Sequence, residues 1–343
     1  MEWVVNGRFR GKVQTGVQRV AAAYLARIRS PHVVVEPEVP SNGLKGHWWE
    51  QVALPRKGGD RPLWSPCNTG PLLVSNQIVT IHDAVTFDHP EWFSRSFVSV
   101  YRMLLPKLAQ RCRKIVTVSH FSRDRLALHL GVPKKAIDVI WNGVDSHFTP
   151  ASDEAIAQAR KAIGLEDAPY FLTLSTLEPR KNLKLVLNAW ARARGRLPKH
   201  CKLVIVGPKG DSQIFRDTNL DGVGSDVITS GFLPDEILVG LLSGAQAVLY
   251  PSLYEGFGLP VVEAMACGAP VITCALASLP EVAGEAAIYV DPIQPDEMAE
   301  QMVRLSQSAQ LRGDLAEEGK AQAALFSWDN AAREMDSILA AAA

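Results

Sequence analysis

The chain has 343 residues, more than the ~250–300 at which a single hydrophobic core stops growing, so its length predicts two domains. Apolar residues make up 47% of the chain and charged residues 21%, a composition that excludes a disordered protein. The formal net charge of zero argues against a nucleic-acid partner, but the charge is unevenly spread. Residues 1–150 carry 20 basic and 11 acidic side chains, whereas residues 151–343 carry 16 and 25.

The cysteines and the hydropathy pattern indicate the cellular compartment. Five scattered cysteines without a Cys-x-x-Cys pair argue against a disulfide framework and a structural zinc site, and they fit a reducing cytosol. The first residues lack the basic segment and apolar core of a signal peptide, and no apolar run approaches the ~18 residues of a membrane span. We therefore expect a cytoplasmic protein.

Short β-branched runs alternate with helical patterns in the first half of the chain. Helices are predicted at about 17–29, 92–113 and 120–130. Residues 40–70 hold Pro, Gly and Trp with weak periodicity, and we interpret them as an irregular connection. Strands are predicted at Val33–Val35, Leu72–Val74, Ile78–Ile81, Ile115–Val118 and Ile137–Ile140.

The second half repeats this alternation. Helices are predicted at about 182–194, 235–243, 259–266, 295–306 and 311–325. Strands are predicted at Tyr170–Leu174, Leu203–Val206, Val227–Thr229, Ala247–Tyr250, Val271–Thr273 and Ile288–Val290. Such strands belong to parallel sheets covered by helices on both faces, so the fold class is α/β with two Rossmann-like domains. Turn residues after Asn142 set the predicted division at residues 1–148 and 149–326.

The most informative segment is Tyr250-Pro-Ser-Leu-Tyr-Glu255-Gly-Phe-Gly-Leu-Pro-Val-Val-Glu263. A strand ends at Tyr250, and a glycine-rich loop leads into a helix whose first amides, from Gly256 to Leu259, suit phosphate oxygens. Glu255 precedes these amides, and Glu263 is expected in the first helical turn. Ionised carboxylates only accept hydrogen bonds, so sugar or ribose hydroxyls are suitable partners. The alternative is that both glutamates only complement the helix dipole.

A second segment, Glu178-Pro-Arg180-Lys181-Asn182, follows the first strand of the second domain. Asn182 is expected to cap the following helix. The helix dipole disfavours two cations at a helix start, and a bound anion would remove this conflict. A solvated surface pair is the alternative interpretation.

Two further features have weaker signals. Gly16 lies in Gln14-Thr-Gly-Val-Gln-Arg19, at the start of the first predicted helix, where a glycine permits a ligand to approach the backbone. His82, in Thr80-Ile-His-Asp83, follows a buried strand and is placed at its carboxyl end. No Walker A motif, dinucleotide-binding glycine triplet or cluster of metal ligands is present, so neither a metal nor another cofactor is expected.

With these motifs in place, the chain resembles the retaining glycosyltransferases of family 4 (group 1). The resemblance is carried by Glu255-x7-Glu263 and by Thr-Gly-Val-Gln-Arg, Ile-His-Asp, Val-Ser119-His-Phe-Ser, Trp-Asn-Gly-Val-Asp and Glu-Pro-Arg-Lys-Asn. It implies the GT-B architecture, in which two Rossmann-like domains face each other across a cleft. It also implies that the C-terminal helix, residues 327–343, crosses back onto the first domain.

The resemblance also implies roles for donor-site residues. Glu255 would accept hydrogen bonds from the transferred sugar, and Glu263 would hold the nucleotide ribose. Arg180 and Lys181 would stabilise the diphosphate, with Gly16 allowing the N-terminal loop to approach it. The remaining donor contacts would come from the loop residues Gly256, Phe257, Gly258 and Leu259 and from the nucleobase-flanking Gly231, Phe232 and Leu233.

On the acceptor side, the resemblance places His82 near the reacting sugar, together with Asp83 and Ser119. The implied reaction transfers a hexose from a nucleotide sugar to a glycan or lipid-linked glycan, with retention of configuration. Glu255, His82, Arg180 and Lys181 would be the catalytic residues. The sequence as a whole resembles bacterial mannosyltransferases of polysaccharide and lipopolysaccharide assembly, and this resemblance favours GDP-mannose as the donor.

Several alternatives stay open at this point. The same chemistry with a UDP- or dTDP-sugar is one of them. A second alternative is a nucleotide-sugar epimerase of the same architecture, which would need no acceptor. A third is a non-catalytic protein that binds the nucleotide sugar without converting it.

The helix predicted at about 92–113 adds a hypothesis about localisation. It combines aromatic and aliphatic residues with a series of basic ones, including Arg95, Arg102, Lys107 and Arg111. An ordinary amphipathic helix packed on its sheet explains the apolar face equally well. The functional interpretation is that the basic face docks on the anionic inner face of the cytoplasmic membrane, where lipid-linked acceptors reside.

Overall fold

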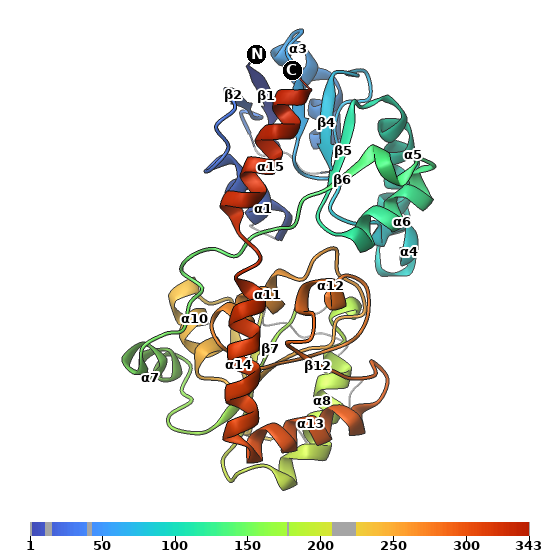
Figure 1. The fold of residues 1–343 in the computed structure, drawn as a ribbon. Helices are drawn as coiled ribbons and strands as arrows, with labels where there is room; N and C mark the ends of the chain where they lie inside the picture. Colours follow the sequence, from blue (N-terminus) through green and yellow to red (C-terminus); the bar gives the residue numbers. More distant parts are fainter. Residues whose placement is uncertain (1, 11–15, 40–42, 177, 208–223, 343) are drawn as a thin grey trace. The chain divides into compact units, whose positions relative to one another are not determined.

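The computed structural model describes residues 2–10, 16–39, 43–176, 178–207 and 224–342, and the chain divides into two compact units (Figure 1). The first unit comprises Met1–Gly143 and Ser327–Ala343, and the second comprises Val144–Phe326. The division thus lies five residues before the predicted one at 148/149. The backbone N–H of Val144 donates to the carbonyl of Phe326, so a hydrogen bond joins the first and the last residue of the second unit.

The first unit contains a six-stranded parallel sheet with the strand order β2-β1-β3-β4-β5-β6. Its strands are β1 (Trp3–Asn6), β2 (His32–Val35), β3 (Leu63–Ser65), β4 (Gln77–Thr80), β5 (Lys114–Thr117) and β6 (Ile137–Val139). Its helices are α1 (Gly16–Leu25), α2 (Gly43–Trp48), α3 (Leu54–Gly58), α4 (Val85–Asp88), α5 (Arg95–Arg111), α6 (His120–Leu130) and α15 (Trp328–Ala341). Three short helical turns, η1 (Trp49–Ala53), η2 (Pro90–Trp92) and η3 (Lys134–Ala136), complete the described elements, and η1 is a π-helix.

The first unit differs from the prediction in three places. Residues 72–74, predicted as a strand, form a turn in which Leu73 is 83% exposed. Side-chain amides satisfy the backbone there, since Gln51 Oε1 accepts from the N–H of Leu72 (2.9 Å) and Gln77 Nε2 donates to the carbonyl of Pro71 (2.6 Å). The strand between β1 and β4 in the sheet is instead β3. It lies within the segment at 40–70 that was predicted to be irregular, and that segment also contains α2, η1 and α3. Strand β1, which is entirely buried, was not predicted.

The second unit contains another six-stranded parallel sheet, in the order β12-β11-β10-β7-β8-β9. Its strands are β7 (Tyr170–Leu174), β8 (Lys202–Val206), β9 (Val227–Gly231), β10 (Ala247–Tyr250), β11 (Val271–Thr273) and β12 (Ile288–Tyr289), each within two residues of its prediction. Its helices are α7 (Asp153–Ala162), α8 (Leu183–Ala193), α10 (Asp235–Ser243), α11 (Leu259–Ala266), α12 (Leu279–Ala283), α13 (Pro295–Gln307) and α14 (Ala309–Ala323), with short turns η4 (Pro179–Lys181) and η5 (Arg194–Arg196).

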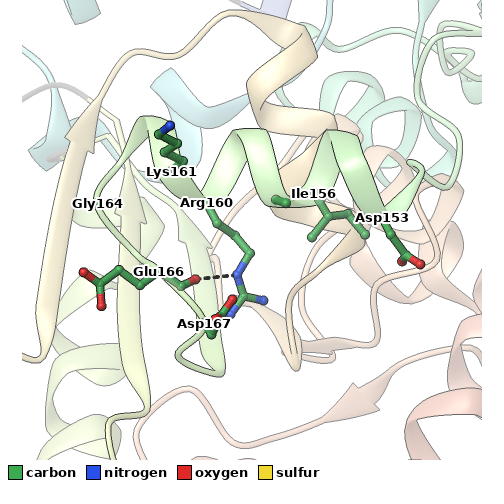
Figure 2. Close-up of a pocket in the computed structure, with 8 residues that line it drawn as sticks. Asp153, Ile156, Arg160, Lys161, Gly164, Glu166 and Asp167 are labelled. Atoms are coloured by element: carbon green, nitrogen blue, oxygen red, sulfur yellow. Dashed lines mark hydrogen bonds between the residues drawn. The ribbon is translucent and has the colours of Figure 1, made fainter.

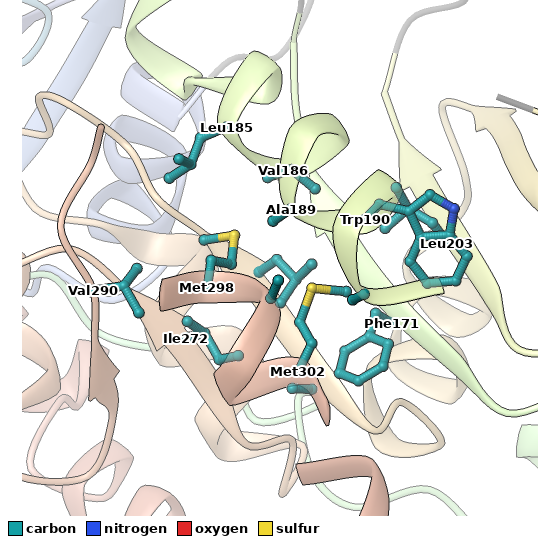
Figure 3. Close-up of a cluster of buried hydrophobic side chains, with 14 of the residues drawn as sticks. Phe171, Leu185, Val186, Ala189, Trp190, Leu203, Ile272, Val290, Met298 and Met302 are labelled. Carbon is teal, nitrogen blue, oxygen red and sulfur yellow. The ribbon is translucent and has the colours of Figure 1, made fainter. Parts of the chain in front are cut away.

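Apolar side chains from α8 and α13 cover one face of the second sheet. Figure 3 shows Trp190 of α8 and Met298 and Met302 of α13 beside the strand residues Phe171 and Ile272. All five are almost completely buried. The parallel strand orders of the two sheets confirm the α/β prediction. Such parallel strands need helices on both faces of the sheet. No helix in the described ranges combines the length and apolar character needed to cross a bilayer.

The strand order of the second sheet determines where a ligand can bind. From β7 the chain first forms β8 and β9 on one side, and then returns to form β10 and β11 on the other side of β7. The loops that leave the carboxyl ends of β7 and β10 consequently lead in opposite directions. In open parallel sheets this point of divergence is the usual position of a ligand crevice.

Candidate functional site

The loops after β7 and β10 in the second unit are joined by two hydrogen bonds to one backbone carbonyl. The carbonyl oxygen of Arg180 accepts from the N–H of Leu253 (2.7 Å) and from the hydroxyl of Ser252 (3.1 Å). These bonds hold η4, which follows β7, against the loop that follows β10. Residues that are about 70 positions apart in the sequence thereby come together.

Glu255 lies at the centre of this junction, with its side chain only 10% exposed. Its Oε1 accepts from Lys181 Nζ (2.6 Å), Tyr250 OH (2.8 Å) and Ser252 Oγ (2.6 Å). Its Oε2 accepts from Arg180 Nη1 at 3.0 Å. The ammonium group of Lys181 also donates to the hydroxyl of Tyr250 and lies 4.7 Å from the centre of its ring. The carboxylate is therefore held in one orientation by four donors from two loops.

The charges at this junction are strongly coupled. Burial alone would raise the pKa of Glu255, but the positive charges of Lys181 and Arg180 and the hydrogen bonds from Lys181 and Ser252 lower it to about 2. Burial lowers the pKa of Lys181, and Glu255 partly counteracts this effect. Burial and the charge of Glu255 together raise the pKa of Tyr250, which consequently stays a protonated donor. At neutral pH the low pKa of Glu255 keeps its carboxylate ionised, beside the guanidinium of Arg180 and the amino group of Lys181.

This geometry revises the interpretation of Arg180 and Lys181. Their position before a helix suggested a bound anion, and within the chain that anion is the carboxylate of Glu255. Asn182 precedes α8 as predicted, but its side chain does not cap the helix. It has a left-handed backbone (φ 52°), and its Nδ2 donates to the carbonyl of Pro292 at 2.9 Å. Asn182 thus anchors the turn to a distant loop.

The glycine-rich loop after Glu255 leads directly into α11. Gly258, at the N-terminal cap of α11, has φ 108°, and a Cβ there would lie 3.1 Å from Leu279, so a side chain would be strained. The hydroxyl of Ser278 donates to the carbonyls of Glu255 and Phe257 (2.9 and 2.8 Å) and fixes the loop from below. The start of α11 therefore provides a rigid N-terminus beside Glu255, an arrangement suited to an anion.

Other predicted donor residues lie at the same edge of the second sheet. Glu263 is buried in α11, but it lies in the second helical turn rather than the first. Its charge raises the pKa of Tyr250, so it is electrostatically coupled to the Glu255 site. Gly231 ends β9 with φ 81°, and Phe232 after it is 74% exposed; Leu233 follows half-buried. Leu259 is the first residue of α11.

The predicted acceptor-side residues belong to the first unit. His82 is buried after β4, and its Nε2 donates to the carbonyl of Pro66 at 2.8 Å, so Nδ1 is the unprotonated nitrogen. Asp83 Oδ1 accepts from the N–H of Val85, the first residue of α4, whereas Ser119 Oγ accepts from Ser122 N and caps α6. Gly16, which was predicted as a donor-site residue, also lies in the first unit; it is the exposed first residue of α1, and a Cβ added to it would meet no described atom within 4 Å. Gln14 and Thr15 of its motif lie outside the described residues.

Tyr250 and Ser252 were missed as functional residues by the sequence analysis. Both stand in the segment that singled out Glu255, and both donate to its carboxylate. The available signal was the position of these polar side chains at the end of a buried strand and just after it. Residues at that position lie at the carboxyl edge of the sheet, where ligands bind.

A separate hollow of the second unit is unrelated to this chemistry. A cavity of about 660 Å³ lies along α7 and the loop that follows it (Figure 2). Arg160 crosses this region and donates to the carbonyls of Glu166 and Ala168, both at 2.8 Å. The loop leads into the amino end of β7, at the opposite edge of the sheet from Glu255. Its polar groups serve to fix the loop.

Comparison with known proteins identifies the family of the chain. Residues 155–322 match the family model "Glycosyl transferases group 1", and residues 62–148 match "Glycosyltransferase Family 4". The chain is 30% identical to O-antigen chain mannosyltransferase B of Escherichia coli over 76% of its own length and 69% of the relative. It is 29% identical to O-antigen chain mannosyltransferase RfbU of Salmonella typhimurium, over 76% and 72% of the two chains.

Solved structures show the same fold at low sequence identity. The Anabaena protein Alr3699/HepE, crystallised with UDP and glucose, matches with a TM-score of 0.77 and 17% identity, covering 99% of this chain and all of that one. WaaG, a glycosyltransferase involved in lipopolysaccharide biosynthesis, matches with a TM-score of 0.75 and 15% identity, covering 98% and 99%. The fold is accordingly of the GT-B type. The chain belongs to the group 1 glycosyltransferases of family 4, a family of retaining enzymes.

Proposed function

We propose that the chain transfers a hexose, mannose from GDP-mannose, to a glycan or lipid-linked glycan of a bacterial surface polysaccharide. The observation that carries the proposal is the junction at which Arg180, Lys181 and the N-terminus of α11 surround the buried carboxylate of Glu255. Mannose is favoured because two relatives at about 30% identity are O-antigen mannosyltransferases. A UDP- or dTDP-sugar is the alternative donor, and the HepE structure with UDP and glucose favours UDP.

In this proposal the donor diphosphate shares the two cations with Glu255. Arg180 offers five N–H donors in a planar fork, and Lys181 offers a compact charge, so together they match two phosphate groups. The amides of Gly256, Phe257, Gly258 and Leu259 add partial positive charge at the start of α11. As the bond between the anomeric carbon and the phosphate oxygen breaks, its electron pair stays on the diphosphate. These preorganised donors stabilise the developing charge.

The carboxylate of Glu255 then serves the sugar. An ionised carboxylate accepts hydrogen bonds from sugar hydroxyls, and the low pKa of Glu255 keeps it ionised. Tyr250 and Ser252 hold its orientation. Glu263 is proposed to accept from the ribose hydroxyls, and Gly231, Phe232 and Leu233 to flank the base. The acceptor hydroxyl attacks the anomeric carbon on the leaving-group face, and its proton passes to the departing phosphate oxygen.

The first unit is proposed to bind the acceptor and to hold the enzyme at the membrane. His82, Asp83 and Ser119 are assigned to the acceptor side on the family resemblance, and Gly16 is assigned to the approach of the first unit to the donor diphosphate. The exposed basic face of α5 is proposed to dock on the anionic inner face of the cytoplasmic membrane, which would bring the enzyme to lipid-linked acceptors.

Product analysis tests the function. The full chain is incubated with GDP-mannose, UDP-glucose or a dTDP-sugar, with and without a bacterial lipid extract, and the products are identified by mass spectrometry. We expect a hexose to be added to a lipid-linked glycan from GDP-mannose and only in the presence of the extract. Conversion of the sugar without an acceptor would indicate an epimerase. Nucleotide-sugar binding without any product would indicate a non-catalytic protein.

The substitution Glu255→Gln tests the site in the same assay. It keeps the volume of the side chain, but it removes the negative charge and replaces one carboxylate oxygen by an NH₂ group, which donates hydrogen bonds and does not accept them. We expect turnover to fall by about 100-fold or more, the size expected when one transition-state contact is lost. Nucleotide binding should persist, because Arg180 and Lys181 remain. The matched control is Glu317→Gln, an exposed glutamate of α14 paired with Lys320. Wild-type turnover in Glu255→Gln would contradict the assignment.

A further inference from the structure

A second polar cavity, of about 150 Å³, lies within the first unit. It occupies the corresponding topological position, since the chain leaves β1 towards β2 on one side and later forms β3 on the other. This volume is about five times the ~30 Å³ that one water molecule occupies in the liquid, so it suits a single small ring rather than a long chain. The lining residues are Asn6, Arg8, Phe9, Val17, Gln18, Glu50, Cys67, Asn68, Thr69 and Tyr101.

The anchor of this cavity is the carboxylate of Glu50, which is 1% exposed. Its Oε1 accepts from Asn6 Nδ2 (2.9 Å) and Thr69 Oγ1 (3.0 Å), and its Oε2 accepts from Arg8 Nη1 (2.7 Å). Glu50 stands in the π-helix η1, a rare backbone form that is frequent at functional sites. A buried carboxylate is costly to maintain, so this arrangement requires more explanation than packing provides.

Arg8 is held by that carboxylate in an almost buried position, with its side chain 14% exposed. Among the described residues its side chain bonds through Nη1 alone, to Glu50 and to the ring nitrogen of His47. A guanidinium has five N–H donors, so Nε and Nη2 keep donor capacity at the cavity wall. Glu50 thus orients a planar donor group towards the space that it lines.

Asn68 and Tyr101 also line the cavity and add polar groups to it. Asn68 has a left-handed backbone (φ 66°), and its Oδ1 accepts from the N–H of His82 at 2.8 Å, so among the described residues its amide NH₂ keeps its capacity to donate. Burial, and to a smaller extent the charges of Arg8, Glu50 and Asp83, set the pKa of Tyr101 at about 12. Its hydroxyl therefore stays protonated and can both donate and accept.

The charges of the cavity select against an anion. The guanidinium of Arg8 is already neutralised by Glu50 at 2.7 Å, and the charge of Asp83 also acts on this space. A phosphate or carboxylate would meet two negative groups and one shared cation. A neutral ring with several hydroxyls, by contrast, can accept from Arg8 and Asn68 and exchange a hydrogen bond with Tyr101.

We propose that this cavity binds the neutral sugar ring of the acceptor, with Arg8, Asn68 and Tyr101 as its specificity-determining residues. This inference rests on the proposed glycosyl transfer, because it assigns the cavity to the second substrate of that reaction. Glu50 is a positioning residue, which acts by orienting Arg8.

Ligand-observed NMR tests this assignment without turnover. Methyl α-mannopyranoside and methyl α-glucopyranoside are added to the full chain in the absence of nucleotide sugar, and transfer of saturation from protein to glycoside is measured. We expect transfer to at least one glycoside, and we expect inorganic phosphate not to displace it. Displacement by phosphate, or the absence of transfer to both glycosides, would overturn the proposal.

Two conservative variants locate the binding. Tyr101→Phe keeps the ring that stacks on Phe97 and removes only the hydroxyl, and Asn68→Asp keeps the oxygen that accepts from His82 but removes the NH₂ donor. Loss of one such hydrogen bond is worth about 1.4 kcal/mol, so each variant should weaken glycoside binding by about tenfold and raise the acceptor KM similarly. Tyr24→Phe, the same change outside the cavity, should alter neither.

The outcome is separable from that of the proposed function. Glycoside binding that survives Tyr101→Phe and Asn68→Asp but is lost in Glu255→Gln would place the sugar at the donor site and overturn the inference. Glycoside binding that follows the predicted pattern, in a chain that turns over no nucleotide sugar, would contradict the proposed transfer reaction while leaving a sugar-binding cavity.

Discussion

Arg180 and Lys181 show how the meaning of a residue depends on its partner. Two cations before a helix conflict with the helix dipole, and the sequence alone suggested an external anion as the solution. Glu255, which lies 75 and 74 positions further along the chain, supplies a negative charge internally. A donor diphosphate would have to share these cations with Glu255. Such competition would couple diphosphate binding to a change in the hydrogen bonds of the carboxylate that receives the sugar.

His82 carries a prediction about pH at the same scale. Burial lowers its pKa from 6.5 to about 4, partly offset by the hydrogen bond to Pro66. Between these values the unfolded chain binds a proton that the folded unit does not. The free energy of unfolding of the first unit should therefore fall as the pH drops from about 6.5 to about 4, by up to about 3 kcal/mol. Hydrogen exchange of peptides that cover β4, corrected for intrinsic rates, measures this loss.

The substitution His82→Gln separates this titration from other effects of acid. The glutamine amide can donate to the same carbonyl of Pro66 but does not titrate, so the pH dependence should flatten. His32→Gln, on β2, leaves His82 in place and should keep the wild-type profile. An unchanged slope in His82→Gln would show that other groups control the acid sensitivity of this unit.

At the scale of elements, the second sheet was predictable because its strands are near-continuous apolar runs bounded by turn residues. Strands β7, β10 and β11 have the predicted limits. Strands β1 and β3 escaped prediction because each is short and contains tryptophan and a polar residue that the fold buries, Asn6 or Ser65. Their burial depends on long-range hydrogen bonds such as that from Asn6 Nδ2 to Glu50, which no local pattern reveals.

The same limit applies to the sites. The segment around Glu255 could be identified because strand end, glycine loop and helix start are contiguous in the sequence. The cavity around Glu50 could not, because its residues come from β1 and the loop after it, α1, η1, the β3–β4 connection and α5. Only the strand order brings these residues together, and that order was not deducible from periodicity.

Helix α5 bears the membrane prediction. Its apolar side packs in the first unit through Val98, Leu104, Leu105, Leu108 and Ala109. Its basic residues Arg102, Lys107 and Arg111 are exposed, and in the described part of the chain none of the three forms an ion pair with an acidic side chain. Met103, 60% exposed, lies among them. Cations without acidic partners beside an apolar side chain are suited to an anionic lipid surface.

We expect the full chain to sediment with liposomes that contain anionic lipid and not with neutral ones, and to be released by high salt. Each basic residue near such a surface contributes about 1 kcal/mol, so replacing Arg102, Lys107 and Arg111 by Gln should weaken binding by about 100-fold. Equal binding to neutral and anionic liposomes would contradict the electrostatic mechanism.

The matched control removes three cations from the second unit. Arg192, Arg194 and Arg196 all face acidic partners, Asp296, Asp226 and Glu300 respectively. Their replacement by Gln should leave liposome binding unchanged, because these charges are already compensated. Loss of binding in this variant would show that net charge, rather than the face of α5, decides docking.

At the scale of the whole molecule, the balanced net charge arises from two oppositely charged units. With the structural boundaries, the first unit holds 21 basic and 13 acidic side chains, and the second holds 15 and 23. A zero total therefore does not exclude an anionic partner for the first unit. The positive sign of the first unit agrees with its proposed docking on the anionic membrane surface.

The C-terminal helix α15 follows the second unit in sequence but belongs to the first in structure. Its Trp328 is 4% exposed and packs edge-on against Tyr24 of α1, with ring centres 5.6 Å apart. Asp336 accepts from the backbone N–H groups of Arg29 and Ser30 (2.9–3.1 Å), which follow α1. The first unit is therefore completed by the last residues of the described chain.

This connectivity predicts which unit a core substitution will destabilise. Trp328→Ala should cost about 3–5 kcal/mol and should speed hydrogen exchange in β1 and α1, far away in the sequence, while α14 directly before it keeps its protection. Trp190→Ala, a change of equal size in the core between α8 and the second sheet, should loosen β7 and β8 instead. Exchange measured by mass spectrometry on both variants distinguishes the two patterns. Loss of protection in α14 and β7 after Trp328→Ala would mean that the two units unfold as one. Only a shared cooperative core could make the cavity left by Trp328 destabilise the second sheet.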